Sequence, residues 1–408
     1  MNISAIILAA VLVLIAIRQV CGITLQIWQI MLGGAIAVIL TDQIPIQAAL
    51  LAINLDVMIF LAAMFIIGEA MQESGYLLHV SYRLFGKARS VDELILLILF
   101  CMGCLSALLM NDTLAIVGTP LMLYLSRVHH IAPKLLLLSL AFAVTTGSVV
   151  SPIGNPQNLL IAINGGLADP FIEFFKFLLI PTAINLLIAY LILRLFYKDQ
   201  FKNAPINCIQ EPITDQRLAF LSEISFALLI VLVAAKIAAV LLCVGAGFRL
   251  TYIALLSALP IVILSRKRLE IIRKIDWHTL IFFAAMFVLM ESVWRSGTFQ
   301  FILTNANIDI YSTPTILATS VLLSQLISNV PFVALYQPLL IGASAKDLMA
   351  LAAGSTIAGN LFVLGAASNV IIIQNAEKKG ETLTFMDFAR VGIPLTVVDI
   401  LIYWLFLG

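Results

Sequence analysis

Long apolar stretches constrain this chain more than any other feature of its sequence. Residues 3–17, 177–193 and 226–244 are almost free of charged side chains, and a helix that crosses a bilayer needs about 20 predominantly apolar residues. Of the 408 residues, 62% are hydrophobic and 11% are charged, whereas about a quarter of an ordinary soluble chain is charged. The sequence therefore predicts a polytopic membrane protein. A net charge of +1 gives no reason to expect a nucleic-acid partner.

Hydropathy and its polar interruptions predict an all-α fold with ten membrane crossings and both chain ends outside. The predicted crossings are 3–17, 23–40, 55–76, 133–165, 171–196, 219–243, 249–265, 277–296, 348–375 and 391–407. Those at 133–165 and 348–375 are interrupted by polar residues. Two further apolar stretches, 93–127 and 311–345, contain a polar tip. We predict that each of them forms a re-entrant hairpin.

The basic residues predict the orientation of the chain. They gather in connections between spans, as at 83–89 and 266–274, whereas 41–53 and 297–313 contain no Lys or Arg. Loops rich in Lys and Arg face the cytoplasm. We therefore expect a multi-pass protein of the cytoplasmic (inner) membrane, embedded in the lipid bilayer with its basic loops on the cytoplasmic side.

Self-similarity divides the chain into two repeats. Segments 54–77 and 276–299 share, in identical register, the word AAMF, a glutamate (Glu69 and Glu291) and a Ser-Gly pair. The predicted organisation is N-terminal transmembrane helices over 1–50, a first repeat over 51–197, a cytoplasmic linker over 198–217 and a second repeat over 218–408. An odd number of predicted crossings separates the two segments. We therefore predict that the repeats are inverted, as in many secondary transporters.

The segment 145–161 cannot easily form one continuous membrane helix. Pro152 and Pro156 each remove a backbone donor and clash with the preceding turn. Unpaired backbone groups at this depth persist only where they are buried in protein or line a watery cavity. One interpretation is a proline kink solvated by its own Ser and Thr side chains. The other is a broken helix that turns polar groups toward a ligand, with the candidate residues Thr146, Ser151, Gly154, Asn155 and Asn158.

A second interruption lies in 354–374 and is built on glycine instead of proline. Its block 365–369 matches the block 154–158 of the first repeat. Because the breaks occur at equivalent places in the two repeats, we interpret them as a pair. The second set of candidate binding residues is Thr356, Gly365, Ser368 and Asn369.

A polar hairpin tip precedes each break. The first tip consists of Asn111, Asp112 and Thr113, and the matching tip of the second repeat contains Ser328 and Asn329. An ionisable residue within a membrane is expensive and is by default a functional candidate. We interpret Asp112 as a ligand for a cation or a proton, as an N-cap for an arm that begins at Thr113, or as both. Val330 stands at the equivalent position of the second tip, so the halves differ chemically.

These residues predict an ion site and no organic cofactor. The expected coupling ion is Na⁺ or H⁺, and the two would compete at Asp112. The predicted neighbourhood of a bound Na⁺ consists of Asn111, Asp112, Asn155, Asn329 and Ser368.

The words NDTLAIVGTP, SPIGNPQN and SNVP together resemble the ion-transporter superfamily over residues 50–400. That group includes arsenite-efflux permeases, NhaD-type sodium/proton antiporters, citrate permeases and divalent-anion/sodium symporters. The Asn-Asp tip followed by Thr-Pro is most similar to the arsenite-permease branch. The divalent-anion symporters carry Ser-Asn-Thr at both tips, and this chain departs from that pattern. The resemblance implies a homodimer with a scaffold and a moving transport domain.

The function predicted from these features is secondary active transport of a small inorganic or organic anion or of arsenite. No Lys or Arg lies within 105–120, 145–165, 320–340 or 354–375, so an anion would be held by helix N-termini, amides and hydroxyls. A Na⁺/H⁺ antiporter of NhaD type is one alternative, and an anion channel is an alternative of another class. The buried segments contain no catalytic set typical of an enzyme and the chain has no Walker motif. A separate ATPase subunit is left open.

Overall fold

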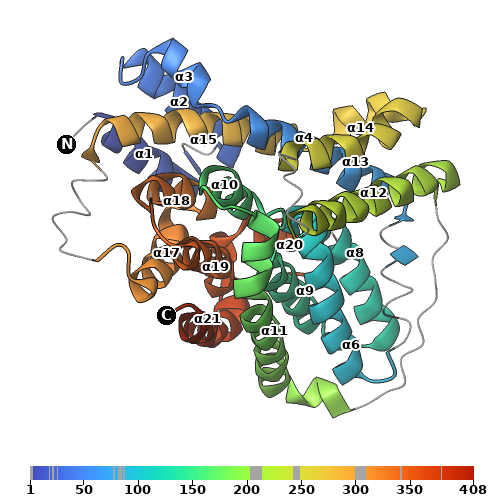
Figure 1. Ribbon diagram of the computed structural model, residues 1–408. Coiled ribbons are helices and arrows are strands. Elements are labelled where there is room, and N and C mark those ends of the chain that lie inside the picture. The colour runs from blue at the N-terminus through green and yellow to red at the C-terminus, as the bar shows by residue number, and fades with distance from the viewer. Residues whose placement is uncertain are drawn as a thin grey trace.

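The computed structural model describes residues 3–76, 79–80, 85, 88–202, 214–241, 249–298, 309–340, 342–377 and 379–408, apart from residues 18, 21, 22 and 25. Helices make up nearly all of the secondary structure of these residues (Figure 1). The one sheet among them pairs β1 (Gln19–Val20) antiparallel with β2 (Ile23–Thr24).

The described helices occur in both halves of the chain. The first half contains α1 (Ile3–Ile17), α2 (Ile27–Leu40), α3 (Ile46–Ala52), α4 (Leu55–Glu73), α6 (Val91–Leu97), the π-helical turn η1 (Ile98–Met102), α7 (Gly103–Leu109), α8 (Asn111–His129), α9 (Pro133–Ser148), α10 (Pro156–Asn164), α11 (Pro170–Phe196) and η2 (Lys198–Lys202). The second half contains α12 (Gln216–Leu241), α13 (Leu250–Leu264), α14 (Arg268–Lys274), α15 (Trp277–Arg295), α17 (Thr313–Ile327), α18 (Asn329–Tyr336), η3 (Gln337–Leu340), α19 (Ala345–Leu361), η4 (Val363–Gly365), α20 (Ala367–Glu377) and α21 (Phe385–Leu407).

The all-α polytopic fold is confirmed. In the described part of the chain, six helices are long and apolar enough to cross a membrane: Leu55–Glu73, Val91–Leu109, Pro170–Phe196, Gln216–Ala239, Trp277–Arg295 and Phe385–Leu407. Both predicted interruptions are also present. The first separates α9 from α10 and the second separates α19 from α20.

The helices form two layers (Figure 1). The upper layer combines α1–α4 with α12–α15, and its packing crosses between the halves, because α2 packs on α15 and α4 packs on α13. The lower body contains the two hairpins, the interrupted helices, α11 and α21, with α9 against α19 and α11 against α21. The candidate site residues therefore belong to one body of helices.

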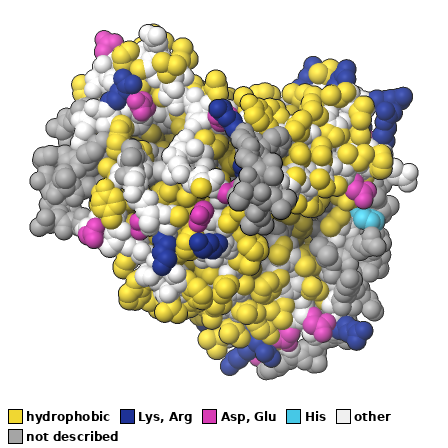
Figure 2. All heavy atoms as spheres, in the orientation of Figure 1, with side chains coloured by type: hydrophobic (Ala, Val, Ile, Leu, Met, Phe, Trp, Pro, Cys, Tyr) yellow, Lys and Arg dark blue, Asp and Glu magenta, His cyan; other side chains and the backbone are white. Residues whose placement is uncertain are grey.

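Hydrophobic side chains cover much of the outer surface. Figure 2 shows them across most of the visible face, with groups of Lys and Arg at the upper right and lower edges. On α11 the side chains of Phe175, Leu191 and Leu195 are exposed, as is Leu405 on α21. Apolar side chains that project from long helices in this way are suited to contact with lipid tails rather than water.

Two local departures from the sequence prediction have local causes. The last helix begins at Phe385 and not at 391, because Thr384 and Asp387 form a capping box in which Thr384 Oγ1 accepts from the backbone of Asp387. The short helices α3 and α14 were not predicted, since each has seven residues and is too short for a clear period.

Equivalent local geometry recurs in the two halves. Asn54 caps α4 by accepting from Val57 N at 3.1 Å, and Asp276, its counterpart in the second repeat, caps α15 by accepting from Thr279 N at 3.0 Å. The same register relates α3 to α14, so the recurrence extends upstream of residue 51, where the first repeat was predicted to begin. The two repeats thus share backbone geometry and helix caps as well as amino-acid sequence. Its inversion remains a prediction.

The hairpins also turn in the same way. Met110 has φ 67° and Ser328, its counterpart before the second tip asparagine, has φ 68°. Non-glycine residues rarely adopt this conformation, and it concentrates at functional sites. The arm 91–109 of the first hairpin has 19 residues and is about 28 Å long at 1.5 Å per residue. The arms of the second hairpin are shorter. Re-entry of both hairpins remains a prediction.

We expect the two tips to be labelled from opposite sides of the membrane. Inversion places the tip at Asn111 on the cytoplasmic side and the tip at Asn329 on the outer side. The measurement uses Asn111→Cys and Asn329→Cys in a background without the five native cysteines, with an impermeant thiol reagent before and after permeabilisation. Gln47→Cys and Arg273→Cys, both at exposed positions, report the outer and cytoplasmic faces. Labelling of both tips from the same side would refute the inversion.

Candidate functional site

Asparagine side chains hold together the ends of the first interrupted helix. Asn158 Nδ2 donates to the carbonyls of Ser148 and Ser151 at 3.1 Å and to that of Val149 at 3.3 Å. Asn155 caps α10, since its Oδ1 accepts from Asn158 N at 2.8 Å. The last carbonyls and the first N–H groups of a helix have no partner within it. The two asparagines therefore supply hydrogen-bond partners for the backbone groups at the break, and both are fully buried.

The second interruption is satisfied by the same device. Asn369 Nδ2 donates to Gly359 O at 2.6 Å, which reaches back ten residues as the bond from Asn158 to Ser148 does. Gln325, on the first arm of the second hairpin, donates from Nε2 to Ala358 O at 2.7 Å. Equivalent asparagines thus close both breaks, and in the second half a hairpin side chain assists.

Both breaks need glycine at one position because the backbone folds closely on itself there. A Cβ on Gly154 would lie 2.5 Å from Ser148 O, and a Cβ on Gly365 would lie 2.6 Å from Ala358 O. Side chains essentially never approach a carbonyl oxygen this closely. The predicted importance of Gly154 and Gly365 therefore has a steric cause and does not require contact with a ligand.

The two interrupted helices touch each other through polar side chains. Thr356 Oγ1, on α19, accepts from Asn155 Nδ2 at 3.2 Å and donates to Asn158 Oδ1 at 3.3 Å. Asn360, near the end of α19, donates from Nδ2 to Thr146 Oγ1 at 3.0 Å. All of these side chains are buried. Predicted residues from both repeats thus form one polar network at the contact between α9, α10 and α19.

The first hairpin tip is bound to the first break. Asn111 N donates to Gly154 O at 3.0 Å, and Asn111 Oδ1 accepts from Asp112 N at 3.0 Å. On the other side of the tip, Thr113 packs closely on Gly68 of α4. The tip is therefore held between the break and a helix of the upper layer.

The prediction that Asp112 is the N-cap of the second arm is wrong. Helix α8 begins at Asn111, earlier than predicted, and its cap residue is Met110, which makes no side-chain cap bond. The positive φ of Met110 reverses the chain abruptly, and the bond from Asn111 N to Gly154 O fixes the first helical residue. Asp112 instead lies in the first turn of α8, where the helix dipole favours a negative charge.

The second tip and second break retain oxygen atoms without hydrogen-bond partners among the described residues. They are Asn329 Oδ1, Ser368 Oγ and Asn369 Oδ1, and their residues are buried. Buried polar groups in native proteins nearly always have partners. These three oxygens are therefore available to an ion or a solute, whereas Asn155 and Asn158 are occupied in holding the first break together.

Other polar residues of the site were missed in the sequence. Gln325 is a long amide among the hydroxyl and apolar side chains of the arm α17, and Asp399 is an acid inside the apolar helix α21. An ionisable or amide group at such depth was the available signal.

Ser151, one of the predicted residues, accepts a hydrogen bond from Ile153 N at 3.3 Å and so has a local role in the break.

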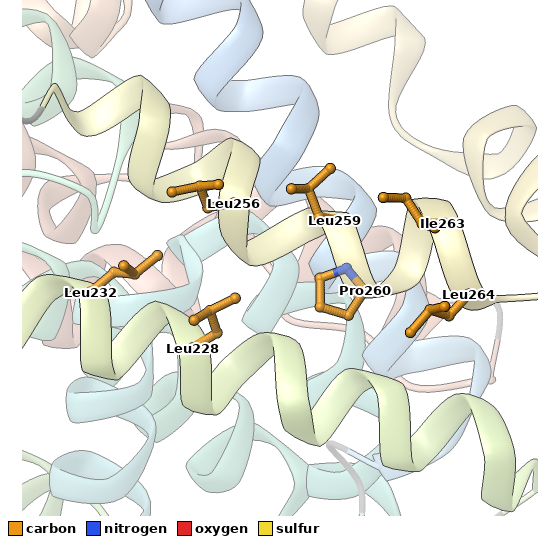
Figure 3. A pocket seen from close by; sticks show the side chains of 7 residues that line it. All are labelled: Leu228, Leu232, Leu256, Leu259, Pro260, Ile263 and Leu264. Carbon is orange, nitrogen blue, oxygen red and sulfur yellow. The ribbon is translucent and has the colours of Figure 1, made fainter.

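The groove between α12 and α13 is a poor candidate for the solute site. Figure 3 shows its lining, which consists of Leu228, Leu232, Leu256, Leu259, Pro260, Ile263 and Leu264. Its volume is about 400 Å³. Solute sites combine an apolar wall with a few converging polar groups, and this lining has no polar side chain.

Paired interrupted helices, hairpin tips and an apolar exterior define a membrane transporter rather than an enzyme. Residues 10–348 match the family described as CitMHS, citrate transporter, and the chain belongs to this family. The predicted resemblance to the ion-transporter superfamily is thereby confirmed, while the placement near its arsenite-permease branch remains a prediction.

Similar proteins agree with this assignment. The chain is 27% identical over 375 residues to the 46 kDa membrane protein of Mycobacterium leprae, covering 87% of this chain and 86% of that one. It is 25% identical over 443 residues to the silicon efflux transporter LSI3 of Oryza sativa subsp. japonica, covering 90% and 89%. Among solved structures, the YdaH transporter of Alcanivorax borkumensis shares the fold with a TM-score of 0.59 at 14% identity, covering 99% of this chain and 96% of that one.

Proposed function

We propose that the protein is an ion-coupled secondary transporter of the cytoplasmic membrane whose substrate is a small anion that travels with a cation. The observation that carries the proposal is the set of partnerless oxygens on Asn329, Ser368 and Asn369, beside helix ends in a region without basic residues. The family description, citrate transporter, supports an anion.

Helix ends supply the positive potential that the side chains lack. Helices α8 and α18 begin at the tips, and α10 and α20 begin at the breaks. Each helix N-terminus carries the equivalent of about half a positive charge, which favours an anion. An anion bound there is only partly neutralised, because the first-tip side chain Asp112 adds a negative charge. A cation held by Asp112 and the partnerless oxygens would neutralise the remaining negative charge.

A neutral hydroxylated solute such as arsenous acid is the second candidate. The similarity to a silicon efflux transporter favours it, and such a solute needs hydroxyl and amide partners without a fixed base. Na⁺/H⁺ exchange and an anion channel are the remaining alternatives. Burial of Asn155, Asn158 and Thr356 favours a carrier, because a channel needs a continuous polar path. A homodimer belongs to the same proposal and is tested by light scattering in detergent.

The proposal is tested in proteoliposomes with citrate, sulfate and arsenite under imposed Na⁺ and pH gradients. We expect uptake of one of these solutes to follow an ion gradient and labelled solute to exchange against unlabelled solute. Ser368→Ala removes a partnerless hydroxyl and should weaken transport at least tenfold while the protein stays folded. Ser139→Ala, where the hydroxyl bonds only to the carbonyl of Leu135 one turn earlier, is the matched control. Solute flow that does not depend on a Na⁺ or pH gradient, without exchange of labelled against unlabelled solute, would indicate a channel.

We expect Asp112→Asn to fold and to lose gradient-driven transport. The substitution keeps the size of the side chain but removes the negative charge that would bind the coupling cation. Val330 at the equivalent position of the second tip offers no replacement. Exchange at equal ion concentrations should persist. The measurement is transport by the purified variant with and without Na⁺ and pH gradients, and unchanged gradient dependence would contradict the role of Asp112.

A further inference from the structure

A carboxyl group with incomplete hydrogen bonding is buried in the last helix. Asp399 lies in α21 with no exposed surface. Its Oδ2 accepts from Asn360 Nδ2 at 2.9 Å, and its Oδ1 has no partner among the described residues. An ionised carboxylate needs several donors, and burying one without them is costly. One amide does not meet this requirement.

The bond to Asn360 connects Asp399 to both interrupted helices. Asn360 is the last residue but one of α19, and its Nδ2 also donates to Thr146 Oγ1 at 3.0 Å. Thr146 is the last residue but two of α9. A single amide group therefore joins the carboxyl group of α21 to the ends of α9 and α19, immediately before their breaks.

Further partnerless oxygens lie on the same three helices, α9, α19 and α21. Asn360 Oδ1 and the hydroxyls of Thr396 and Thr145 have no partner among the described residues, and all three residues are at most 1% exposed. Thr396 precedes Asp399 by three residues and so lies on the same face of α21. The two hydroxyls can donate as well as accept, and neither bonds to Asp399 Oδ1. Asn360 Oδ1 can only accept, and a protonated carboxyl group of Asp399 is a donor for it.

Among the described residues, no basic side chain forms an ion pair with Asp399. Helix α17 and η4 carry no ionisable side chain, and the remaining ionisable side chains of the neighbouring helices lie toward helix ends: Lys134 on α9, Glu173, Lys176, Tyr190 and Arg194 on α11, Lys346 and Asp347 on α19, and Asp387 and Arg390 on α21. The titratable group Tyr403 lies one turn further along α21, and its hydroxyl bonds with Thr182 of α11 at 2.7 Å.

We propose that Asp399, Asn360 and Thr146 form a proton-binding site that joins the two interrupted helices. This inference deepens the proposed function, since it rests on ion coupling, and it adds a second titratable position to Asp112. When the proton is bound, Asp399 is neutral and can donate to Asn360 Oδ1, the oxygen of the same amide group. When the proton leaves, the carboxylate keeps only the bond from Asn360 Nδ2, whose second N–H bonds to Thr146 Oγ1. Proton occupancy therefore changes the hydrogen bonding of the one amide group that links α9, α19 and α21.

The experiment follows the carbonyl stretch of protonated carboxylic acids by infrared spectroscopy of the full chain in lipid nanodiscs. Because the chain has 22 Asp and Glu residues, the variants are compared by difference spectra, and we expect one component of the titrating band to be present in the wild-type protein and in Asp112→Asn and absent from Asp399→Asn. A titrating band that persists unchanged in Asp399→Asn would overturn the proposal. So would the lack of any titrating band in the wild-type protein.

A second variant keeps the test decisive if Asp399→Asn does not fold. Thr396→Val preserves shape and removes a hydroxyl that has no partner among the described residues, so we expect a folded protein in which the band shifts in frequency or in titration midpoint. Thr319→Val, whose hydroxyl bonds within α17 to Thr315 O, should leave the band unchanged. Equal spectra for Thr396→Val and wild type would contradict the site. If the band behaves as expected but no solute follows an ion gradient, the proposed function fails and the proton site stands.

Discussion

Replacing Gly147 by alanine is expected to prevent the first hairpin from packing on the first interrupted helix. A Cβ at this position would lie 2.2 Å from the Cα of Gly103 and 2.4 Å from its carbonyl oxygen. Both are backbone atoms of α7, so no side chain can rotate away and the helices must separate. Small residues let membrane helices approach closely, and this pair of glycines is such a contact.

The expected loss is large because α7 and α9 also position the tip and the break. Overpacking a well-packed core typically lowers the free energy of unfolding by about 1–3 kcal/mol and occasionally more. A clash with backbone atoms should lie at the upper end of this range. We expect a small folded fraction and a clearly lower thermal midpoint, measured by thermal unfolding and by size exclusion in detergent. Gly33→Ala is the matched control, since nothing lies within 4 Å of the added Cβ. Alanine is also the better helix former by about 1 kcal/mol. Equal midpoints for the two variants would contradict this account of the contact.

The breaks were predictable from the sequence because their cause is local. Pro152 and Pro156, four residues apart with Gly154 between them, disfavour a continuous helix whatever the tertiary contacts. The recurrence of Asn158 as Asn369 at the matching position of the second repeat indicated a shared device. The long spans were predictable for a similar reason, since length and hydropathy are read directly from consecutive residues.

The partners of the site residues were not predictable, because tertiary packing determines them. The first residue of α8 depends on a bond from Asn111 to Gly154, which lies beyond the whole of α9 in the sequence. The role of Asn360 depends on α21 lying beside α19, which no local pattern encodes. For the same reason, the sequence could not distinguish Asn158, which closes a break, from Asn329 and Ser368, which keep partnerless oxygens.

Replacing Asn158 by alanine is expected to destabilise the protein rather than to alter transport selectively. The amide donates to the carbonyl of Ser148, the last residue of α9, and to those of Val149 and Ser151 in the break, and its Oδ1 accepts from Thr356. Each buried polar group left without a partner costs about 1–3 kcal/mol, and water cannot easily replace the amide at a fully buried position. We therefore expect one of the largest losses of thermal stability of any single side-chain truncation in the chain.

Two further substitutions separate the hydrogen bonds from the loss of volume. Asn158→Asp keeps the size but replaces the donating amide by oxygen, so it should destabilise the protein at least as much as alanine does. Asn164→Ala, at an exposed position on the same helix, removes a single exposed hydrogen bond, from Asn54 Nδ2 at 3.2 Å, and should cost far less, because surface substitutions usually change stability by less than about 0.5 kcal/mol. The measurement is the thermal midpoint of each purified variant, together with solute exchange by any variant that folds. A variant Asn158→Ala that has the wild-type midpoint but no exchange would show that Asn158 binds the solute and that the break is held by other contacts.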